Sequence, residues 1–417
     1  MTPEIKQRIA QIQRGEVPEG YKRVGHNVIP KSWKRANFDQ VATIRSGLVS
    51  PKEEPYLSMY HIGPDNIEKD TGRINSVKTA SELGLISGKF YFDTSSIVYS
   101  KIRPNLNKIC APNFEGICSA DCYSIQPNKG MDKIYLLNLM LSHEFYKRAV
   151  ACSMRTGMPK INQDDLNVIP LIVSDDIKEQ QNIAAILTTQ DKIIELKEKL
   201  LAEKQHQKKY LMQQLLTGKK RLPGFCGEWG SERLGKLFSE RKETNCETLE
   251  MLAITGTQGI IPRKELDLKD NSSEDKSKYL KICVGDIGYN TMRMWQGVSA
   301  YSNYEGIVSP AYTILKPNRN INAKYFACLF KMPEIIFLFY QFSQGLVDDT
   351  RNLKYENFKK IKVLYPKDEK EQTAIVEVLS TADYEIDLLQ KDIEQEKQKK
   401  KALMQLLLTG IVRVYNG

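Results

Sequence analysis

Residues 176–218 have the sequence DIKEQQNIAAILTTQDKIIELKEKLLAEKQHQKKYLMQQLLTG, and residues 368–410 have the sequence DEKEQTAIVEVLSTADYEIDLLQKDIEQEKQKKKALMQLLLTG. The two stretches align without a gap at a shift of 192 residues and are identical at 20 of 43 positions. Average residue usage would give roughly one match in sixteen by chance. The chain therefore contains an internal duplication, and this duplication constrains the fold more than any single motif does.

Each repeated stretch predicts a long helix with an apolar seam. Apolar residues recur at alternating three- and four-residue steps, as in a coiled coil, although Gln190 and Lys197 interrupt the first seam. Gly218 and Gly410 are suited to C-cap the helices, each of which would be about 63 Å long. Because neither seam can be left in water, we expect the helices to pack together, antiparallel, with a globular domain at either end. The seam residues are Ile183, Leu187, Ile194, Leu201, Leu211, Leu215, Ile375, Leu379, Ile386, Leu389, Ile393, Leu403 and Leu407.

The segments outside these helices share a frame but differ in content. Residues 115–119 (EGICS) resemble residues 305–309 (EGIVS), and a tryptophan, Trp33 or Trp229, lies near the start of each half. Between these anchors the halves diverge, which is expected when each half does the same task on a different target.

Short β-rich runs such as residues 96–99 and 311–315 alternate with helical stretches such as residues 134–150 and 323–342. These segments therefore predict an α+β fold with two globular domains, two long antiparallel coiled-coil helices and a pseudo-two-fold internal repeat. The predicted divisions are an N-terminal helix (1–19), a first domain (20–175), a first helix (176–218), a second domain (219–366), a second helix (367–410) and a tail (411–417).

Composition favours a nucleic-acid partner without requiring one. The net charge is +10 and the sequence pI is about 8.9, which suits a phosphate backbone. The N-terminus has no secretory h-region, and the most apolar stretch, residues 335–342, is far shorter than the roughly 20 residues that cross a bilayer. Eight scattered cysteines without a CxxC pair indicate reduced thiols. We therefore expect a cytoplasmic protein with no membrane partner.

The order of domains and helices resembles the specificity subunit of Type I restriction–modification systems. The phrases that carry the resemblance are Gly15 to Tyr21 (GEVPEGY), Lys178 to Gln181 (KEQQ), Lys219 to Phe225 (KKRLPGF) and Ser100 to Asn105 (SKIRPN), together with both LLTG helix ends. The resemblance covers essentially the whole chain. The second domain departs from it, with Tyr289 to Trp295 (YNTMRMW) in place of SKIRPN, which we interpret as a different half-site specificity.

The resemblance implies a non-catalytic reader of a split target in double-stranded DNA. In this family each recognition domain reads one half of the target. The helices set the unread spacer and dock two adenine-methyltransferase subunits, which motor–nuclease restriction subunits join. The chain itself would hold no cofactor, and S-adenosylmethionine and ATP would bind only to the partner subunits. Two domains on one face of a duplex must lie about 34–36 Å apart, so a rigid helix pair would act as a ruler.

Motifs for catalysis are absent or incomplete. The Asn/Asp-Pro-Pro-aromatic motif and the glycine-rich loop of a methyltransferase do not occur. Residues 230–237 differ from a phosphate-binding loop at their last position, Leu237, and Leu234 and Leu237 are better explained as core. Asp191, Glu195 and Lys197 are spaced as a solvated helix face. The four histidines are not paired at metal-ligand spacing, so no metal is expected.

Arg, Lys, Asn and Gln side chains in loops are suited to contact base edges or phosphates. The candidates are Lys101, Arg103, Asn105, Asn107, Lys108, Arg155 and Lys160 in the first domain, and Arg293, Trp295, Gln296, Arg351, Asn352 and Lys354 in the second. Basic clusters at the helix ends (Lys208, Lys209, Lys219, Lys220, Arg221, Lys399, Lys400 and Lys401) would contact phosphates or an acidic methyltransferase surface. For all of these residues, ordinary solvation is the competing explanation.

Two other functions remain open from the sequence. One is a coiled-coil scaffold that binds proteins without reading DNA, and the other is a stand-alone DNA methyltransferase with a degenerate site. A scaffold would lack the sequence-selective, salt-dependent DNA binding that is expected of the complex of a specificity subunit. The missing methyltransferase motifs argue against the enzyme.

Overall fold

The computed structural model describes residues 2–153, 159–256, 258–266, 275–318 and 320–414. The chain forms two compact units: unit 1 comprises residues 1–197 and 392–417, and unit 2 comprises residues 198–391. Each unit therefore contains one globular domain and a part of both long helices.

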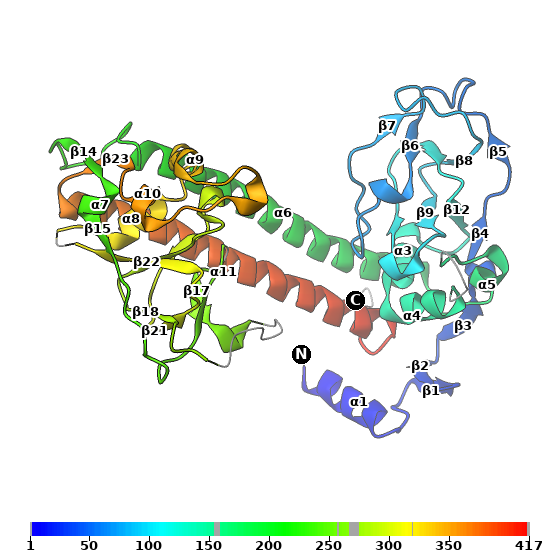
Figure 1. Ribbon diagram of the computed structural model, residues 1–417. Helices are drawn as coiled ribbons and strands as arrows, with labels where there is room; N and C mark the ends of the chain where they lie inside the picture. The colour runs from blue at the N-terminus through cyan, green and yellow to red at the C-terminus, as the bar shows by residue number, and fades with distance from the viewer. Residues whose placement is uncertain (1, 154–158, 257, 267–274, 319, 415–417) are drawn as a thin grey trace. The chain divides into compact units, whose positions relative to one another are not determined.

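The two repeated stretches form the long helices α6 (Ile177–Leu215) and α11 (Glu369–Leu408), of 39 and 40 residues. They lie side by side in each unit (Figure 1). In unit 1, Gln190 and Lys197 of α6 contact Glu396 of α11, and in unit 2 Lys204 contacts Glu385. Partner numbers in α11 fall as those in α6 rise, so the helices run antiparallel. The predicted packing of the two helices is confirmed.

The predicted seam residues are shielded from solvent, and six of them belong to the hydrophobic cores of the two units: Ile183, Leu187 and Leu407 in unit 1, and Leu215, Ile375 and Leu379 in unit 2. None of the thirteen seam residues is exposed, and most are buried. Gly218 and Gly410 end the helices with φ angles of 70° and 72°, in the left-handed region that favours glycine at a C-cap. A Cβ atom on Gly410 would lie 2.6 Å from the Pro30 ring, so close packing also requires glycine there.

Unit 1 is an α+β domain preceded by the short helix α1 (Pro3–Gln13), which Thr2 caps. Its strands form a four-stranded sheet in the order β10-β9-β12-β4, a five-stranded sheet in the order β5-β8-β11-β6-β7, and the pairs β1-β2 and β13-β3. Only the β6–β11 pairing is parallel among the pairings described in this unit. The remaining elements are β1 (Tyr21–Val24), β2 (Asn27–Pro30), β3 (Trp33–Asn37), α2 (Phe38–Val41), β4 (Ala42–Ile44), β5 (Leu48–Val49), β6 (Tyr60–Ile62), η1 (Pro64–Asn66), β7 (Lys78–Thr79), β8 (Lys89–Phe92), β9 (Ile97–Ser100), η2 (Pro104–Leu106), β10 (Ile109–Cys110), β11 (Gly116–Cys118), β12 (Cys122–Pro127), α3 (Lys133–Leu141), α4 (His143–Cys152), α5 (Gln163–Asn167) and β13 (Pro170–Ser174).

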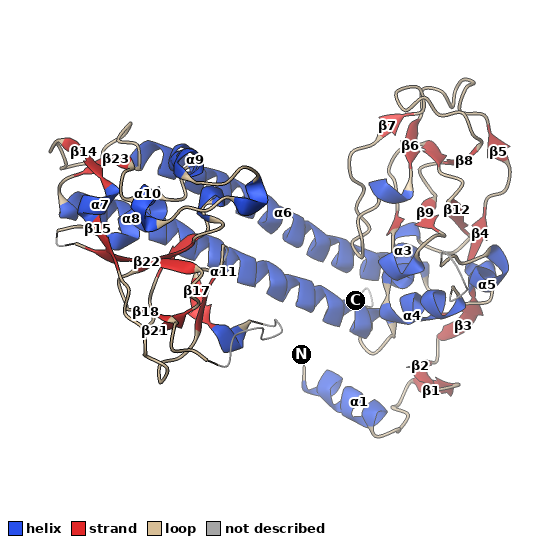
Figure 2. Cartoon of the chain, viewed as in Figure 1, coloured by secondary structure: helices blue, strands red, loops and turns tan. Residues whose placement is uncertain are grey.

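Within the described residues, unit 2 repeats this arrangement with fewer strands than unit 1. Figure 2 distinguishes its strands from its helices. Its sheets have the orders β15-β22-β19-β20, β14-β23, β16-β17 and β18-β21. The four-stranded sheet corresponds to that of unit 1, and the pair β14-β23 corresponds to β3-β13. The elements are β14 (Trp229–Arg233), α7 (Leu234–Leu237), β15 (Phe238–Glu240), β16 (Leu252–Ile254), β17 (Ile260–Pro262), η3 (Arg263–Glu265), β18 (Leu280–Ile282), β19 (Ile287–Asn290), η4 (Met294–Gln296), β20 (Ser299–Tyr301), β21 (Gly306–Val308), β22 (Tyr312–Pro317), α8 (Ala323–Leu329), α9 (Pro333–Phe342), η5 (Asp348–Thr350), α10 (Tyr355–Phe358) and β23 (Lys362–Pro366).

Both predicted helical stretches are broken in the structure. Residues 134–150 divide into α3 and α4 because Ser142 is extended and its hydroxyl caps the second helix. Residues 323–342 divide into α8 and α9 because Met332 is extended before Pro333, which starts the second helix. Local apolar periodicity continues across both breaks, which is why the sequence alone suggested one helix each time.

No single helix within the described residues is long and apolar enough to cross a membrane. The bent pair α8 and α9, at 84° to each other, passes that test when taken together. Phe326 and Phe339 of this pair are fully buried in the core of unit 2.

Candidate nucleic-acid interface

In each domain, the candidate contact residues lie on two segments of the chain, and backbone hydrogen bonds hold these two segments together. In unit 1, the loop after β9 lies beside residues 159–161, because the Ile161 amide donates to Lys101 O (2.9 Å) and the Arg103 amide donates to Pro159 O (2.8 Å). In unit 2, the Leu353 amide donates to Thr291 O at the same distance of 2.9 Å. A buried tyrosine hydroxyl donates to the backbone of the second segment in each domain: Tyr123 to Ile161 O in unit 1 (3.3 Å) and Tyr289 to Leu353 O in unit 2 (3.0 Å).

Several candidates in the first loop hold its shape. Asn107 is buried and adopts a φ of 44°, with its amide nitrogen directed at Leu141 O. The Lys108 ammonium donates to Pro64 O (2.7 Å). Lys101 lies over the rings of Tyr123 and Phe90, and burial lowers the pKa of its ammonium group.

Three candidates of the first domain face solvent: Arg103, Asn105 and Lys160. Arg103 adopts a left-handed φ of 49° at the tip of the loop, before the short helix η2. Lys160 forms an antiparallel β-bridge with Ile102, so its backbone lies beside the same loop. Arg155 lies outside the described residues.

The second domain presents a different surface at the corresponding place. The Trp295 indole nitrogen donates to Met292 O (2.9 Å), and its ring lies edge-on to Tyr340. Arg351 stacks on Tyr340 at 3.9 Å and pairs with Asp348. Asn352 donates to Gln344 O and Thr350 O. The candidates that face solvent here are Arg293, Gln296 and Lys354.

Sequence reasoning missed the apolar tip beside this surface. Leu346 is 99% exposed and Val347 is 59% exposed, in the loop that closes onto Asn352 through Gln344. Two adjacent apolar residues in an otherwise polar loop were a visible signal, because such a loop has no core to bury them.

The repeated Glu-Gln pair at the start of each long helix joins that helix to its domain. Gln180 accepts from the Asp132 amide and donates to Gly130 O and Ser174 O, so it bridges α6 to the turn before α3. Gln372 accepts from the Asn322 amide and donates to Pro366 O in the same manner. Both glutamines are buried. The motif is therefore a structural joint between helix and domain.

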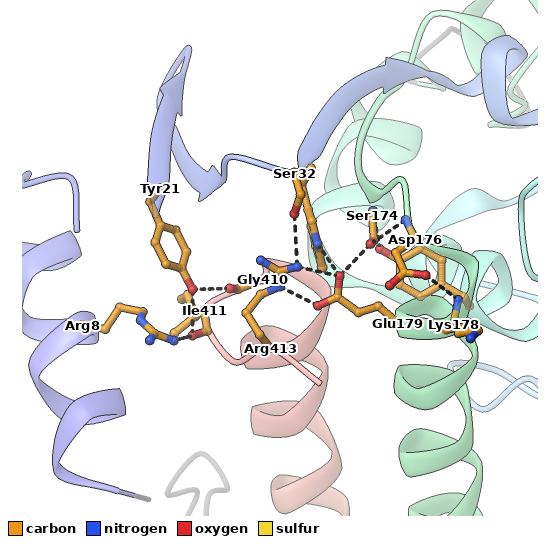
Figure 3. A network of polar contacts seen from close by, with 12 residues as sticks. Arg8, Tyr21, Ser32, Ser174, Asp176, Lys178, Glu179, Gly410, Ile411 and Arg413 are labelled. Carbon is orange, nitrogen blue, oxygen red and sulfur yellow. Dashed lines mark hydrogen bonds and ion pairs between the residues drawn. The ribbon is translucent and has the colours of Figure 1, made fainter. Parts of the chain in front are cut away.

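The glutamates of the same pairs are buried and fully bonded. Glu179 accepts from the Trp33 indole nitrogen (2.8 Å), from the Ser174 hydroxyl (2.7 Å) and from two nitrogens of Arg413 (2.5 and 3.0 Å) (Figure 3). Burial raises the pKa of this carboxyl, but the hydrogen bonds from Arg413, Ser174 and Trp33 outweigh burial and hold the pKa below its usual value. In unit 2, Glu371 accepts from two nitrogens of Arg221 (2.5 and 2.7 Å) and from the Trp229 indole (3.4 Å).

A polar layer crosses the helix pair in unit 1. Gln190 is buried and donates to Glu396 Oε2 (2.6 Å), while Lys197 pairs with Glu396 (2.9 Å) and Asp392 (2.8 Å). Hydrogen bonds from Lys197 and Gln190 lower the pKa of Glu396 to about 2. The two residues that interrupt the first apolar seam therefore bind partners on the other helix.

Other charged groups that the sequence singled out are also engaged within the protein. Asp191 pairs with Lys400, Lys208 with Asp383, and Lys399 with Glu396. Of the basic clusters, the exposed residues are Lys209, Lys219, Lys220, Lys399 and Lys401.

Motifs weighed for catalysis have structural roles. Leu234 and Leu237 of the incomplete phosphate-binding loop are buried in the core of unit 2. Cys118 and Cys122 are buried as well, and all eight cysteines are free. In the part of the chain that the structure describes, no group of three or more His, Cys, Asp or Glu side chains could hold a metal ion.

The sequence matches a known family once in each half. Residues 30–205 and 234–398 match the Type I restriction modification DNA specificity domain, and these ranges make up more than half of the chain. The chain therefore belongs to this family of DNA-specificity proteins.

A particular relative is the Type I restriction enzyme EcoDI specificity subunit of Escherichia coli, which is 40% identical over 169 residues. The alignment covers 40% of this chain and 35% of the relative, or about a third of the relative's length.

Solved structures share the fold across nearly the whole chain. A structure described as the basis of complex assembly and conformational transition of the type I R-M system has a TM-score of 0.60 at 17% identity, and covers 92% of this chain and 99% of its own. The S subunit from M. genitalium has a TM-score of 0.55 at 16% identity (93% and 98% covered), and the HsdS subunit from Thermoanaerobacter tengcongensis has a TM-score of 0.51 at 18% identity (92% and 98% covered).

Proposed function

We propose that this chain is the DNA-specificity subunit of a Type I restriction–modification complex, in which each domain reads one half of a split target. The observation that carries the proposal is the repeated frame with unlike surfaces. Both domains bring a loop after a central strand (β9 or β19) against a second segment, through the same backbone hydrogen bond. The exposed side chains at that junction differ between the domains, as two different half-sites require.

The proposal includes partners that supply the chemistry. Two methyltransferase subunits would bind S-adenosylmethionine and modify adenine, and motor–nuclease subunits would use ATP, so that this chain itself carries out no catalysis and binds no cofactor. The complex would act on double-stranded DNA in the cytoplasm.

The long helices offer a surface for the methyltransferase subunits. On α11, Tyr384 and Leu388 are 65% and 47% exposed and lie four residues apart, on one face. On α6, Leu200 and Tyr210 are also exposed. Apolar side chains on a helix that already buries its seam are suited to a partner helix.

The decisive experiment maps methylated adenines across the host genome with and without this gene. A split motif that disappears on deletion supports the proposal and identifies both half-sites. Methylation that is unchanged by deletion contradicts it.

Two rival functions give different results. A stand-alone methyltransferase would methylate DNA as a purified chain, without partner subunits. A protein-binding scaffold would leave the complex without sequence-selective DNA binding, whatever the salt concentration.

A further inference from the structure

The same three-residue clasp occurs once in each unit. In unit 1 it consists of Trp33, Glu179 and Arg413, and in unit 2 of Trp229, Glu371 and Arg221. Each arginine also lies over its tryptophan ring, at 5.8 Å in both clasps. The clasps thus repeat in residue type, hydrogen bonding and stacking.

Each clasp joins three separate parts of its unit. The tryptophan is the first residue of β3 or β14, which belong to the two-stranded sheets β3-β13 and β14-β23. The glutamate lies in the first turn of one long helix. The arginine follows the end of the other long helix, three residues beyond Gly218 or Gly410. Because the helices are antiparallel, the start of one lies next to the end of the other in each unit.

The tail after α11 is held in place by further contacts in unit 1. Arg413 also donates to the Ser32 hydroxyl (3.1 Å), next to Trp33 (Figure 3). The Tyr21 hydroxyl donates to Gly410 O (2.8 Å), and Arg8 donates to Ile411 O (2.7 Å). These hydrogen bonds position the segment that carries Arg413 next to Glu179.

The chemistry of the clasp fixes an orientation that apolar packing alone would leave adjustable. The glutamate side chains are buried, so they require partners, and the planar guanidinium binds a carboxylate through two parallel bonds in one geometry. Apolar contacts are non-directional and tolerate small rotations. A rotation of the domain against the helices would break the clasp.

We propose that the two clasps are positioning devices for target reading, each controlling fidelity at one half-site. Trp33, Glu179 and Arg413 orient the first recognition domain on its helices, and Trp229, Glu371 and Arg221 orient the second. This inference rests on the proposed function, since it assigns a role in reading to residues remote from the candidate DNA contacts. None of the six residues needs to touch DNA.

The test uses the complete complex with its methyltransferase subunits and compares Arg413→Gln with Arg221→Gln. Genome-wide mapping of methylated adenines counts sites that carry one mismatch, separately for each half-site. We expect Arg413→Gln to increase methylation at mismatches in one half-site by roughly tenfold, which corresponds to a loss of about 1.4 kcal/mol of discrimination. Arg221→Gln should do the same at the other half-site. Arg413→Lys keeps the positive charge but cannot form the two parallel hydrogen bonds of a guanidinium group. We therefore expect its fidelity to lie between those of Arg413→Gln and the wild type.

Matched controls remove a cation from an exposed ion pair of the same unit. Arg14→Gln in unit 1 loses a pair with Glu16, and Lys236→Gln in unit 2 loses a pair with Glu232. Neither pair touches a clasp, so both controls should retain wild-type fidelity.

Three outcomes overturn the inference. If either variant increases methylation at mismatches in both half-sites, the clasp does not control one half-site specifically. If a variant lowers total methylation but leaves discrimination against mismatches unchanged, the clasp has a purely structural role. If Arg413→Gln prevents assembly of the complex, unchanged fidelity in assembled Arg413→Lys overturns it. A wild-type complex without a split motif would instead refute the proposed function, so the two failures are distinguishable.

Discussion

Individual side chains at the two loop junctions divide into those that shape the loop and those that face solvent. Residue type did not separate them, since Asn105 is exposed while Asn107, two positions later, is buried. Only side chains that remain free at the surface can read base edges, and Arg103 and Arg293 are the exposed arginines of the two loops.

Replacing these arginines should affect one half-site each. We expect Arg103→Ala to weaken discrimination at a position of the first domain's half-site by about 1–3 kcal/mol, and Arg293→Ala to do so for the second domain's. Competition binding of the complex to single-base variants of the target measures this. If each variant weakens binding equally for all sequences, the arginines contact phosphate and not bases.

The buried Glu179 should be far more important for stability than an exposed glutamate. Glu179→Ala removes the buried carboxylate to which both Arg413 and the Trp33 indole donate, so the free energy of unfolding should fall by about 3–5 kcal/mol. Glu16→Ala removes a half-exposed partner of Arg14 and should cost under about 1 kcal/mol. Urea denaturation of the full chain compares them, and equal losses would contradict the buried role.

At the level of elements, the helix pair combines an apolar seam with one polar layer. Gln190 and Lys197 lie where a uniform seam would have apolar residues, and both bind Glu396. A polar group inside a coiled coil has few satisfactory partners, so it disfavours other registers. The layer therefore sets the alignment of α6 against α11 in unit 1.

The pH dependence of this layer follows from Glu396. The pKa of its carboxyl is lowered from near 4.5 to about 2, so the ionised group stabilises the folded state above pH 4.5, and this contribution is lost as pH falls toward 2. The stability difference between the wild type and Glu396→Gln should therefore shrink over that range, as measured by urea denaturation at several pH values. Glu394→Gln, at an exposed site on the same helix, is the matched control variant. A difference that is constant with pH would contradict this account.

At the scale of the whole molecule, the duplication explains why one chain contains two copies of the DNA-specificity domain. The two units repeat the helix-to-domain joint and the clasp, whereas the loops at the candidate interface differ. A shared frame with variable loops lets each half-site change without rebuilding the helices.

The helix pair should act as a ruler between the half-sites. Deleting residues 198–204 and 385–391, one heptad from each helix, removes about 10 Å of helix at 1.5 Å per residue. At 3.4 Å per base pair, the unread spacer should shorten by about three base pairs while both half-sites stay the same. Mapping methylated adenines gives the new motif, and altered half-site bases would refute the ruler.

The sequence by itself determined the duplication, both long helices, their seam and the α+β character of the domains. These features depend on neighbouring residues: periodicity over a few turns, glycine at each helix end and turn residues between strands. The family resemblance rested on the same local phrases.

Only the tertiary structure decided which polar residues are free and which are engaged. Arg413 meets Glu179 across 234 positions of sequence, and Gln190 meets Glu396 across 206. Such partners depend on how distant segments pack, and burial of a side chain is a property of that packing. For this reason the repeated Glu-Gln pair was recognised as a motif, while its role as joint and clasp became visible only in three dimensions.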